Sequence, residues 1–260
     1  MSYNKSEDKI ETHGDGRLFV KPVTDKKVNG NNNSNTNKIR TPLLTHLEKS
    51  QFQLSDHLQE ILVGNLLGDA HMIKFNITIN SRSNARIRFL QSLEQADFIY
   101  HLYELFKEFT YIEPKINSSL IKETGNTRQN ISFSTRSFGS AACFNEMYSL
   151  FYENKVKVVA PPPSNLDELL TSVGLAYWIM GDGSWLGSGL RLHTNNFNRE
   201  EVELLNNVIN TKFNLNSSIN IASKIKSQYT IYIPSKNIDN LRYLVSPYVL
   251  PYFLYKLGIK

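Results

Sequence analysis

Two long apolar stretches stand out in the hydrophobic pattern of the chain, and each stops at a Gly-Asp pair. Residues 62–70 read Leu-Val-Gly-Asn-Leu-Leu-Gly-Asp-Ala, and residues 175–183 read Leu-Ala-Tyr-Trp-Ile-Met-Gly-Asp-Gly. Apolar residues on all sides predict helices that are buried rather than helices with one wet face. We expect the first helix to begin at Ser55 or Asp56, which suit the N-cap position, and the second to span residues 172–182.

Shorter periodic segments follow each of these helices in a similar order. After the first helix the pattern predicts strands at 73–80 and 86–90, a helix at 95–109, a hairpin of strands at 114–121 and 129–135, and a helix at 144–151. After the second it predicts a strand at 190–194, a helix at 199–213, a hairpin at 219–225 and 230–233, and a helix at 238–244. We interpret the two halves as one αββαββα module used twice, which makes the fold class α+β.

The remaining segments suggest where the modules begin and end. Residues 1–45 are polar and include an Asn/Gly/Ser/Thr tract without hydrophobic period, so we expect a disordered leader and linker there. Three consecutive prolines begin at Pro161 and form a stiff linker. We therefore assign residues 46–160 to the first module and residues 161–260 to the second.

The two Gly-Asp pairs are candidates for metal binding. The last carbonyl groups of a helix have no partner within it, and the helix dipole places partial negative charge at that end. Asp69 and Asp182 add a full negative charge to this pole, which is unfavourable unless a cation binds there. Carbonyl and carboxylate oxygens are the ligands that Mg²⁺ and Ca²⁺ prefer. The alternative is that each Gly-Asp is only a helix cap followed by a turn, but two copies in the same position favour a site.

Composition narrows the possible partners. The formal net charge of the 260 residues is +5, which favours a polyanionic partner. The single cysteine, Cys143, excludes an internal disulfide and a cysteine-built zinc site. The histidines have no metal-like spacing: they are His13, His46, His57, His71, His101 and His193.

Other features bear on location. No segment approaches the ~18 apolar residues of a membrane helix, so we expect no membrane partner. No secretory signal opens the chain, so we expect an intracellular protein. The abundance of Asn, Lys, Ile and Tyr suits an AT-rich genome, such as that of a mitochondrion or other organelle.

Polar residues that alternate with the buried side of the strands form a basic set with few acids. Such residues suit both phosphates and base edges, so we expect them to bind nucleic acid. An ordinary solvated sheet face is the alternative, although such a face usually carries both signs of charge. The residues are Lys74, Asn76, Thr78, Asn80, Arg82, Arg86, Arg88, Lys122, Arg128, Arg136, Trp185, Arg191, His193, Asn195, Lys224, Lys226 and Gln228.

Both apolar stretches resemble the signature helix of the LAGLIDADG homing endonucleases. Residues 62–70 and 175–183 fill its nine positions, with Asp69 and Asp182 at the acidic eighth. The neighbouring Leu-Ala-Tyr-Trp, Gly-Asp-Gly-Ser, Pro-Tyr-Val-Leu-Pro and Leu-Tyr-Lys-Leu resemble the monomeric branch with two repeats in one chain. The resemblance runs from about residue 50 to the C-terminus. It implies a pseudo-two-fold arrangement of two antiparallel saddle-shaped sheets with the signature helices paired at the interface.

Position three of the signature helix differs between the copies, being Gly64 in the first and Tyr177 in the second. In the family, small residues at positions three and seven bring the two helices to backbone distance. Tyr177 departs from this pattern, so the sequence leaves open how closely the two helices approach at this position.

The resemblance also implies the residues of a catalytic site. Its metal is Mg²⁺, with Mn²⁺ or Ca²⁺ able to occupy the same sites, and the implied ligands are Asp69, Asp182 and the carbonyl groups of Gly68 and Gly181. A catalytic lysine is implied after the last helix of each module. Lys256 matches directly, Lys157 is the better match in the first module, and Lys155 is the alternative there.

These features predict a monomeric endonuclease that cuts a long double-stranded DNA site, one strand per aspartate. The resemblance implies 3′ overhangs and a role in the mobility of the intron that encodes the protein. Two alternatives remain open: an RNA-binding maturase that assists splicing of its own intron, and a DNA-binding regulator without catalysis. Both acidic residues are present, which favours cleavage but leaves a dual function possible.

Overall fold

A computed structural model describes residues 11–12, 18–19, 45, 52–75, 83–120, 125–138, 144–159 and 166–259. The chain forms two compact units, Met1–Arg40 and Thr41–Lys260. In the first unit the described residues form two short antiparallel strands, β1 (Glu11–Thr12) and β2 (Leu18–Phe19). Most of the predicted leader lies outside the described residues, so its disorder stays a prediction.

The first half of the second unit contains one complete module. Its elements are α2 (Asp56–Leu67), β3 (His71–Ile73), β4 (Arg86–Ser92), α3 (Ala96–Leu105), β5 (Lys115–Leu120), β6 (Thr127–Ser134) and α4 (Asn145–Phe151). The strands form an antiparallel sheet in the order β3-β4-β6-β5. Single-turn 3₁₀ helices, η1 (Leu93–Gln95) and η2 (Lys107–Phe109), flank α3, and a small hairpin of β7 (Tyr152–Glu153) and β8 (Val156–Lys157) follows α4.

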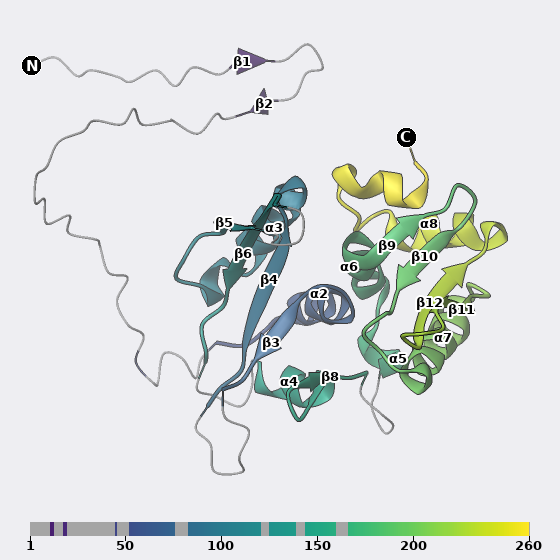
Figure 1. Ribbon diagram of the computed structural model, residues 1–260, viewed down its shortest axis with the longest axis horizontal. Coiled ribbons are helices and arrows are strands. Elements are labelled where there is room, and N and C mark those ends of the chain that lie inside the picture. Colours follow the sequence, from purple (N-terminus) through teal and green to yellow (C-terminus); the bar gives the residue numbers. More distant parts are fainter. Residues whose placement is uncertain are drawn as a thin grey trace, which may run out of the picture. The chain divides into compact units, whose positions relative to one another are not determined.

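The second half repeats this plan. Its elements are α5 (Leu166–Leu169), α6 (Ser172–Asp182), β9 (Gly183–Trp185), β10 (Leu190–His193), α7 (Arg199–Phe213), β11 (Ser218–Ser223), β12 (Gln228–Ile233), η3 (Ser235–Asn237), α8 (Ile238–Val245) and η4 (Pro251–Leu257). The sheet order is β11-β12-β10-β9, again antiparallel. The predicted α+β order of two αββαββα modules is confirmed, and Figure 1 shows the two sheets on either side of the α2–α6 pair.

Side-chain alternation explains how the sheets are held. In the first sheet Ile87 and Phe89 of β4 are buried in the core, opposite Met72 and Phe133 respectively on the neighbouring strands. In the second sheet Leu190 and Leu192 of β10 pair with Ile233 and Ile231 of β12, and all four are buried. Each sheet therefore buries one face under its helices. The opposite face carries Arg88 in the first sheet and Arg191 in the second.

The predicted phase of the first strand is wrong. The strand ends at Ile73, which pairs with Arg86 on the outer face of the sheet, and Phe75 is 64% exposed. Lys74, which was expected outside, has its ammonium group 5.5 Å from the ring centroid of Tyr148, a residue of α4. Ile73 and Phe75 thus lie on the outer side, and the ring of Phe75 lies 5.3 Å from the guanidinium of Arg86.

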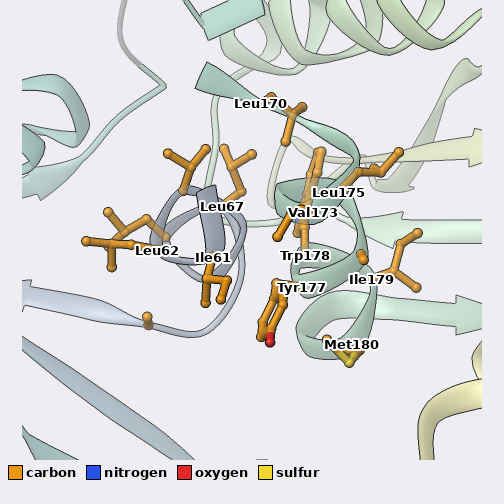
Figure 2. Packing of buried hydrophobic residues seen from close by; sticks show 14 of the residues in the cluster. Ile61, Leu62, Leu67, Leu170, Val173, Leu175, Tyr177, Trp178, Ile179 and Met180 are labelled. Carbon is orange, nitrogen blue, oxygen red and sulfur yellow. The ribbon is translucent and has the colours of Figure 1, made fainter. Parts of the chain in front are cut away.

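The two signature helices pack directly against each other at the centre of the second unit (Figure 2). All residues from Val173 to Met180 in α6 are buried, as are Ile61–Leu67 in α2. The closest approach joins Gly64 to Gly174: a Cβ atom on Gly64 would come within 2.1 Å of the carbonyl oxygen of Gly174. The helices therefore meet at backbone distance despite Tyr177, because Gly174, one turn earlier, provides the space.

Tyr177 of α6 contacts helix α3 of the first module. Its hydroxyl lies 2.7 Å from Nε2 of His101 on α3, and the two rings are nearly parallel with centroids 5.9 Å apart. Burial raises the pKa of Tyr177 to about 12 and lowers the pKa of His101. Both groups are therefore neutral near pH 7, and the tautomer of His101 decides which of the two donates the hydrogen bond. In the described part of the chain no helix is long and apolar enough to cross a bilayer.

Candidate active site at the ends of the paired helices

The helix pair brings the two aspartates together. Helix α2 ends before Gly68, whose N–H donates to the carbonyl of Gly64 at 3.2 Å, and Asp69 follows directly. Helix α6 ends with Asp182 itself. A Cβ atom on Gly68 would lie 3.7 Å from Oδ2 of Asp182, and one on Gly181 would lie 3.9 Å from Oδ2 of Asp69. Each carboxylate therefore lies against the position-seven glycine of the opposite helix.

One lysine contacts each helix end, half-buried Lys157 at the first and buried Lys256 at the second. Lys157 Nζ donates to the carbonyl oxygens of Gly68 at 2.9 Å and Ala70 at 2.7 Å. Lys256 Nζ donates to Met180 at 2.6 Å and Gly181 at 2.9 Å. Both lysines therefore bind the carbonyl at position seven, and Lys256 is only 4% exposed. These bonds satisfy carbonyl groups that the helix leaves unpaired and compensate the negative end of its dipole.

The structure distinguishes the two lysines considered for the first module. Lys155 is exposed in the turn of the β7–β8 hairpin, where its φ is 68°. Lys157 pairs with Tyr152 across the same hairpin and points to the end of α2. The geometry thus selects Lys157, although its catalytic role stays a prediction.

Burial shifts the proton affinity of these groups. It lowers the pKa of Lys157 and of Lys256 to about 8, against the opposing attraction of Asp182 and Asp69. Burial, followed by repulsion from Asp69, raises the pKa of Asp182 to about 7 even though the two lysines act in the opposite direction. The negative charge at this point is therefore only partly compensated by the protein.

Asp69 has a different local environment. It is exposed, and its Oδ2 accepts a hydrogen bond from Nε2 of Gln91 at 2.7 Å. Gln91 lies near the end of β4, in the strand next to β3. Each helix end therefore has an aspartate and a lysine, but the side chains around them differ between the two helix ends.

Two cavities open at the two helix ends. The first, of about 360 Å³, is lined by Gly68, Asp69, His71, Val156, Lys157 and Asn196. The second, of about 680 Å³, is lined by Gln95, Gly181, Asp182, Gly183, Ser184, Trp185, His193, Tyr255 and Lys256. Each cavity thus holds one of the predicted aspartates with its predicted glycine and lysine, and Trp185 and His193 belong to the second.

Each cavity also contains one histidine. His71 Nδ1 lies 3.1 Å from the hydroxyl of Tyr152, and His193 Nε2 lies 2.9 Å from Oγ of Ser184. Burial lowers the pKa of both histidines, with nearby cations acting in the same direction. Among the described residues no cluster of three or more His, Cys, Asp or Glu side chains could hold a metal ion, so a histidine-rich metal site is not formed there.

The residues at the helix ends fit a hard divalent cation. The available donors are the carboxylates of Asp69 and Asp182 with the carbonyl oxygens of Gly68 and Gly181, and oxygen ligands are what Mg²⁺ takes. A carbonyl oxygen that accepts one lysine N–H keeps a second lone pair. Burial and then repulsion from Asp69 raise the pKa of Asp182, and a bound cation would stabilise its charged form.

The basic residues predicted to bind nucleic acid are distributed over both sheets. Arg86, Arg88 and Arg128 point to the outer face of the first sheet, and Arg191 and His193 to that of the second. Arg136 is half-buried against the ring of Tyr111 at 3.4 Å and donates to the carbonyl of Thr110. Lys224, Lys226 and Gln228 lie at the β11–β12 hairpin, beside Asn195.

Several of the residues predicted to bind nucleic acid are not placed on the outer faces of the sheets. Lys74 is on the side of α4, as described above, and Asn76, Thr78, Asn80, Arg82 and Lys122 fall outside the described residues. A groove of about 460 Å³ on the outer face of the first sheet is lined by Arg86, Arg88, Lys115, Asn117 and Arg136 among others. DNA binding by these residues stays a prediction.

Three polar side chains at the site were missed in the sequence: Gln91, Gln95 and Asn196. Gln91 lies near the end of β4, and Gln95 and Asn196 lie in the turns after β4 and β10. Amide side chains are common at such positions, so the sequence gives no local signal of a site. Only the packing of the two modules brings Gln95 and Asn196 to the aspartates. They could not be found from spacing along the chain.

The chain belongs to the LAGLIDADG DNA endonuclease family, whose sequence model matches residues 59–241. The resemblance read from the two apolar stretches is thereby confirmed. The matched residues include both Gly-Asp helix ends and both sheets of the second unit.

Several relatives can be compared individually. Cytochrome b mRNA maturase bI2 of Saccharomyces cerevisiae is 34% identical over 214 residues, which cover 79% of this chain and 48% of that protein. The maturase of the same name from Debaryomyces hansenii is 33% identical, with 79% and 75% covered. Probable intron-encoded endonuclease 1 of Wickerhamomyces canadensis is 32% identical, with 83% and 90% covered. The chain thus spans about half the length of the first of these relatives.

A solved structure supports the same fold. The homing endonuclease I-WcaI, bound to its DNA recognition sequence, aligns with a TM-score of 0.70 and 31% identity over 80% of this chain and 89% of that one. The antiparallel sheets and paired helices are therefore those of a LAGLIDADG endonuclease.

Proposed function

We propose that this protein is a monomeric, site-specific endonuclease that cuts double-stranded DNA with a divalent metal ion, leaves 3′ overhangs and supports the mobility of its intron. The observation that carries the proposal is the double site at the helix ends. Asp69 and Asp182 each lie beside the opposite position-seven glycine, and each helix end has its own lysine, which donates to the carbonyl of that glycine. A protein that only binds DNA would have no need for two lysines held at the helix ends beside two carboxylates.

The roles of the residues follow from their chemistry. A divalent ion at the site, when bound, supplies a Lewis acid and an activated water for phosphodiester hydrolysis. Asp69 and Asp182 hold this charge, and the carbonyl groups of Gly68 and Gly181 complete the oxygen donors. Lys157 and Lys256 are close enough to the carboxylates to stabilise the negative charge that grows on the phosphate. The outer faces of the two sheets carry the arginines that would bind the duplex on either side.

The relatives support the same activity. I-WcaI is described as a homing endonuclease bound to its DNA recognition sequence, and the Wickerhamomyces canadensis relative is named a probable intron-encoded endonuclease. We extend DNA cleavage and an intron origin to this chain on that basis, and with them the expected organellar location.

Cleavage of a randomised duplex library tests the proposal. Purified protein is incubated with the library in Mg²⁺ or in chelator, and cut ends are sequenced. We expect one long preferred site, cut on both strands with 3′ overhangs in Mg²⁺ and uncut in chelator. Binding of a preferred duplex without cleavage in any divalent metal would instead indicate a DNA-binding regulator.

An RNA maturase is the second candidate function, because two relatives at 34% and 33% identity are named cytochrome b mRNA maturases. Splicing of the intron that encodes the chain, with and without added protein, separates the two activities. A maturase accelerates splicing, and Asp69→Asn should leave this acceleration intact while it removes DNA cleavage. Acceleration of splicing without DNA cleavage by the wild type would make the maturase the better assignment.

A further inference from the structure

A pair formed by a tyrosine hydroxyl and an imidazole lies at the edge of the Asp69 cavity. His71, the first residue of β3, is exposed and lines this cavity together with Asp69 and Lys157. Its Nδ1 atom lies 3.1 Å from the hydroxyl of Tyr152 in β7, and the two rings meet edge to face with centroids 5.5 Å apart. The two residues are 81 positions apart in the chain, so the pair could not be recognised in the sequence.

Tyr152 is fixed from two further sides. Its hydroxyl oxygen accepts a hydrogen bond from the backbone N–H of Met72 at 2.9 Å, and its ring stacks on that of Tyr148 with centroids 4.9 Å apart. Tyr152 is only 5% exposed, and burial raises its pKa to about 12, so the phenol keeps its proton. The β7–β8 hairpin that carries Tyr152 also carries Lys157. The hairpin therefore brings both side chains to the segment that follows α2.

These contacts place the ring proton of His71. A phenol has one proton to donate and accepts hydrogen bonds through its oxygen lone pairs. Within the described part of the chain the hydroxyl of Tyr152 has two partners: the N–H of Met72, which can only donate, and Nδ1 of His71. If Nδ1 carried the proton, the buried hydroxyl would have no acceptor, which costs free energy. The arrangement that satisfies every group has the hydroxyl donating to Nδ1 and the ring proton on Nε2.

Nε2 of His71 is then the ring atom that remains available to a ligand. Among the described residues Nε2 has no hydrogen-bond partner. It carries a proton in the imidazolium form as well, so this donor is present at either charge of the ring. The cavity thus combines an N–H donor from His71 with the ammonium group of Lys157. Such donors suit the oxygen of an anion such as a phosphate.

The equivalent position in the second module is occupied by Ser184. It follows Asp182 at the same spacing at which His71 follows Asp69, and each of the two pairs with an arginine of the next strand. Oγ of Ser184 lies 2.9 Å from Nε2 of His193, a residue of β10. This serine is half-buried and can donate or accept. Hydrogen bonds therefore place the ring proton at the first centre but not at the second.

We propose that His71 is a catalytic residue of the Asp69 centre, where its Nε2–H donates to a non-bridging oxygen of the scissile phosphate, and that Tyr152 is the positioning residue that holds its ring. This inference rests on the proposed endonuclease function. In the hydrolysis a water oxygen bonds to phosphorus, the bond from phosphorus to O3′ breaks, the water gives up one proton and O3′ takes one. His71 keeps its own proton throughout. Its hydrogen bond strengthens as charge grows on the phosphate oxygens, so it lowers the barrier rather than only improving binding.

Separate measurement of the two strands tests the inference. A duplex with the preferred site, labelled on one strand or the other, is cut at saturating enzyme in Mg²⁺ by wild type, His71→Phe, Tyr152→Phe and the double variant. We expect His71→Phe to slow the same strand as Lys157→Met, by roughly 10- to 100-fold, and to leave the other strand at the wild-type rate. Tyr152→Phe should slow that same strand by a smaller factor. The double variant should be no slower than His71→Phe, because a tyrosine that acts through His71 has no effect once the imidazole is lost.

Conservative variants separate this role from packing. His71→Gln keeps an N–H donor at the end of the side chain and should recover part of the lost rate, whereas His71→Phe keeps only a ring. Two controls should cut both strands at the wild-type rate. His57→Phe lies in the exposed first turn of α2. Tyr148→Phe keeps the ring stacked on Tyr152 and loses a hydroxyl that makes no hydrogen bond in the described ranges. Duplex affinity and melting temperature of His71→Phe should match wild type.

Several results would overturn the inference and leave the proposed function standing. These are equal slowing of both strands, slowing of the opposite strand, slowing of neither, and a His71→Gln variant as slow as His71→Phe. A double variant that is slower than His71→Phe by the full factor of Tyr152→Phe would overturn the positioning role of Tyr152. A wild-type protein that cuts no duplex in any divalent metal would overturn the proposed function as well.

Discussion

Gly64 of α2 faces Gly174 of α6 so closely that a Cβ atom on Gly64 would lie 2.1 Å from the carbonyl oxygen of Gly174. The same hypothetical atom would lie 2.9 Å from Cβ of Tyr177. This approach sets how near the ends of the helices come to each other. The separation of Asp69 and Asp182 therefore depends on two residues without side chains.

Substitution of Gly64 by alanine should destabilise the protein. The added methyl group meets backbone, which cannot rotate away, so the helices must separate, at a cost of about 1–3 kcal/mol or more in the free energy of unfolding. Gly181→Ala is the matched control, because its Cβ would meet nothing closer than 3.8 Å and alanine favours a helix by up to ~1 kcal/mol. Urea unfolding of both variants in chelator measures the difference. Similar stabilities for the two would show that the helices are not in backbone contact.

Tyr177→Phe should also lower stability, by a smaller amount. The change removes the 2.7 Å hydrogen bond to His101 and leaves Nε2 of that half-buried histidine without its partner. The loss of such a bond costs about 1–2 kcal/mol. Tyr243→Phe is a suitable control because Tyr243 is 83% exposed. If the two variants have the same unfolding midpoint, the Tyr177–His101 contact does not stabilise the fold.

The pH dependence of stability should report the half-buried carboxyl group of Asp182. Its pKa rises from the ordinary 3.8 to about 7 in the folded protein, so between these values the folded chain binds more protons than the unfolded one. The free energy of unfolding therefore falls as pH rises from about 4 to about 7, and the loss is complete above pH 7. Asp182→Asn should be more stable than wild type at pH 7.5 in chelator, and the gap should close toward pH 4. Thermal unfolding over this range measures the gap; parallel curves would contradict it.

The sequence predicted most of the framework correctly because local patterns decide it. Helix α6 has the predicted span, and Ser55 caps α2 through its side chain as expected. The strand phase after α2 was wrong because alternation shows a period but not which side faces the core. At Ile73 and Phe75 the apolar side lies outside, where Arg86 packs on the phenylalanine ring.

Contacts between distant segments could not be predicted. Gly174 lies outside the nine signature positions, and only the crossing of the helices shows that it makes the close approach. The choice between Lys155 and Lys157 depended on a two-residue turn that places one in solvent and the other on Gly68. Gln95 and Asn196 depend on the meeting of the modules, which no local pattern encodes.

The two lysines at the helix ends, Lys157 and Lys256, should affect the chemical step more than binding. If each stabilises the charge that grows on its phosphate, Lys157→Met and Lys256→Met should lower the single-turnover rate by roughly 10²- to 10³-fold, or ~2–4 kcal/mol at the barrier. Duplex affinity should change little. Lys155→Met is the control, since its side chain is exposed in the neighbouring turn. Normal rates at saturating enzyme for Lys157→Met and Lys256→Met would remove both lysines from the mechanism.

Cleavage and binding by the aspartate variants test the central claim most directly. Cleavage of the preferred duplex by wild type, Asp69→Asn and Asp182→Asn is compared in Mg²⁺. Binding to the same duplex is measured in the presence of a chelator, without divalent ions. Because each change removes one charge from the oxygen donors and leaves the basic sheet faces intact, we expect wild type to cut both strands. We expect each variant to bind with near wild-type affinity but to leave at least one strand uncut. Wild-type cutting of both strands by either variant would contradict the assignment of Asp69 and Asp182 as the metal-binding residues of a DNA endonuclease.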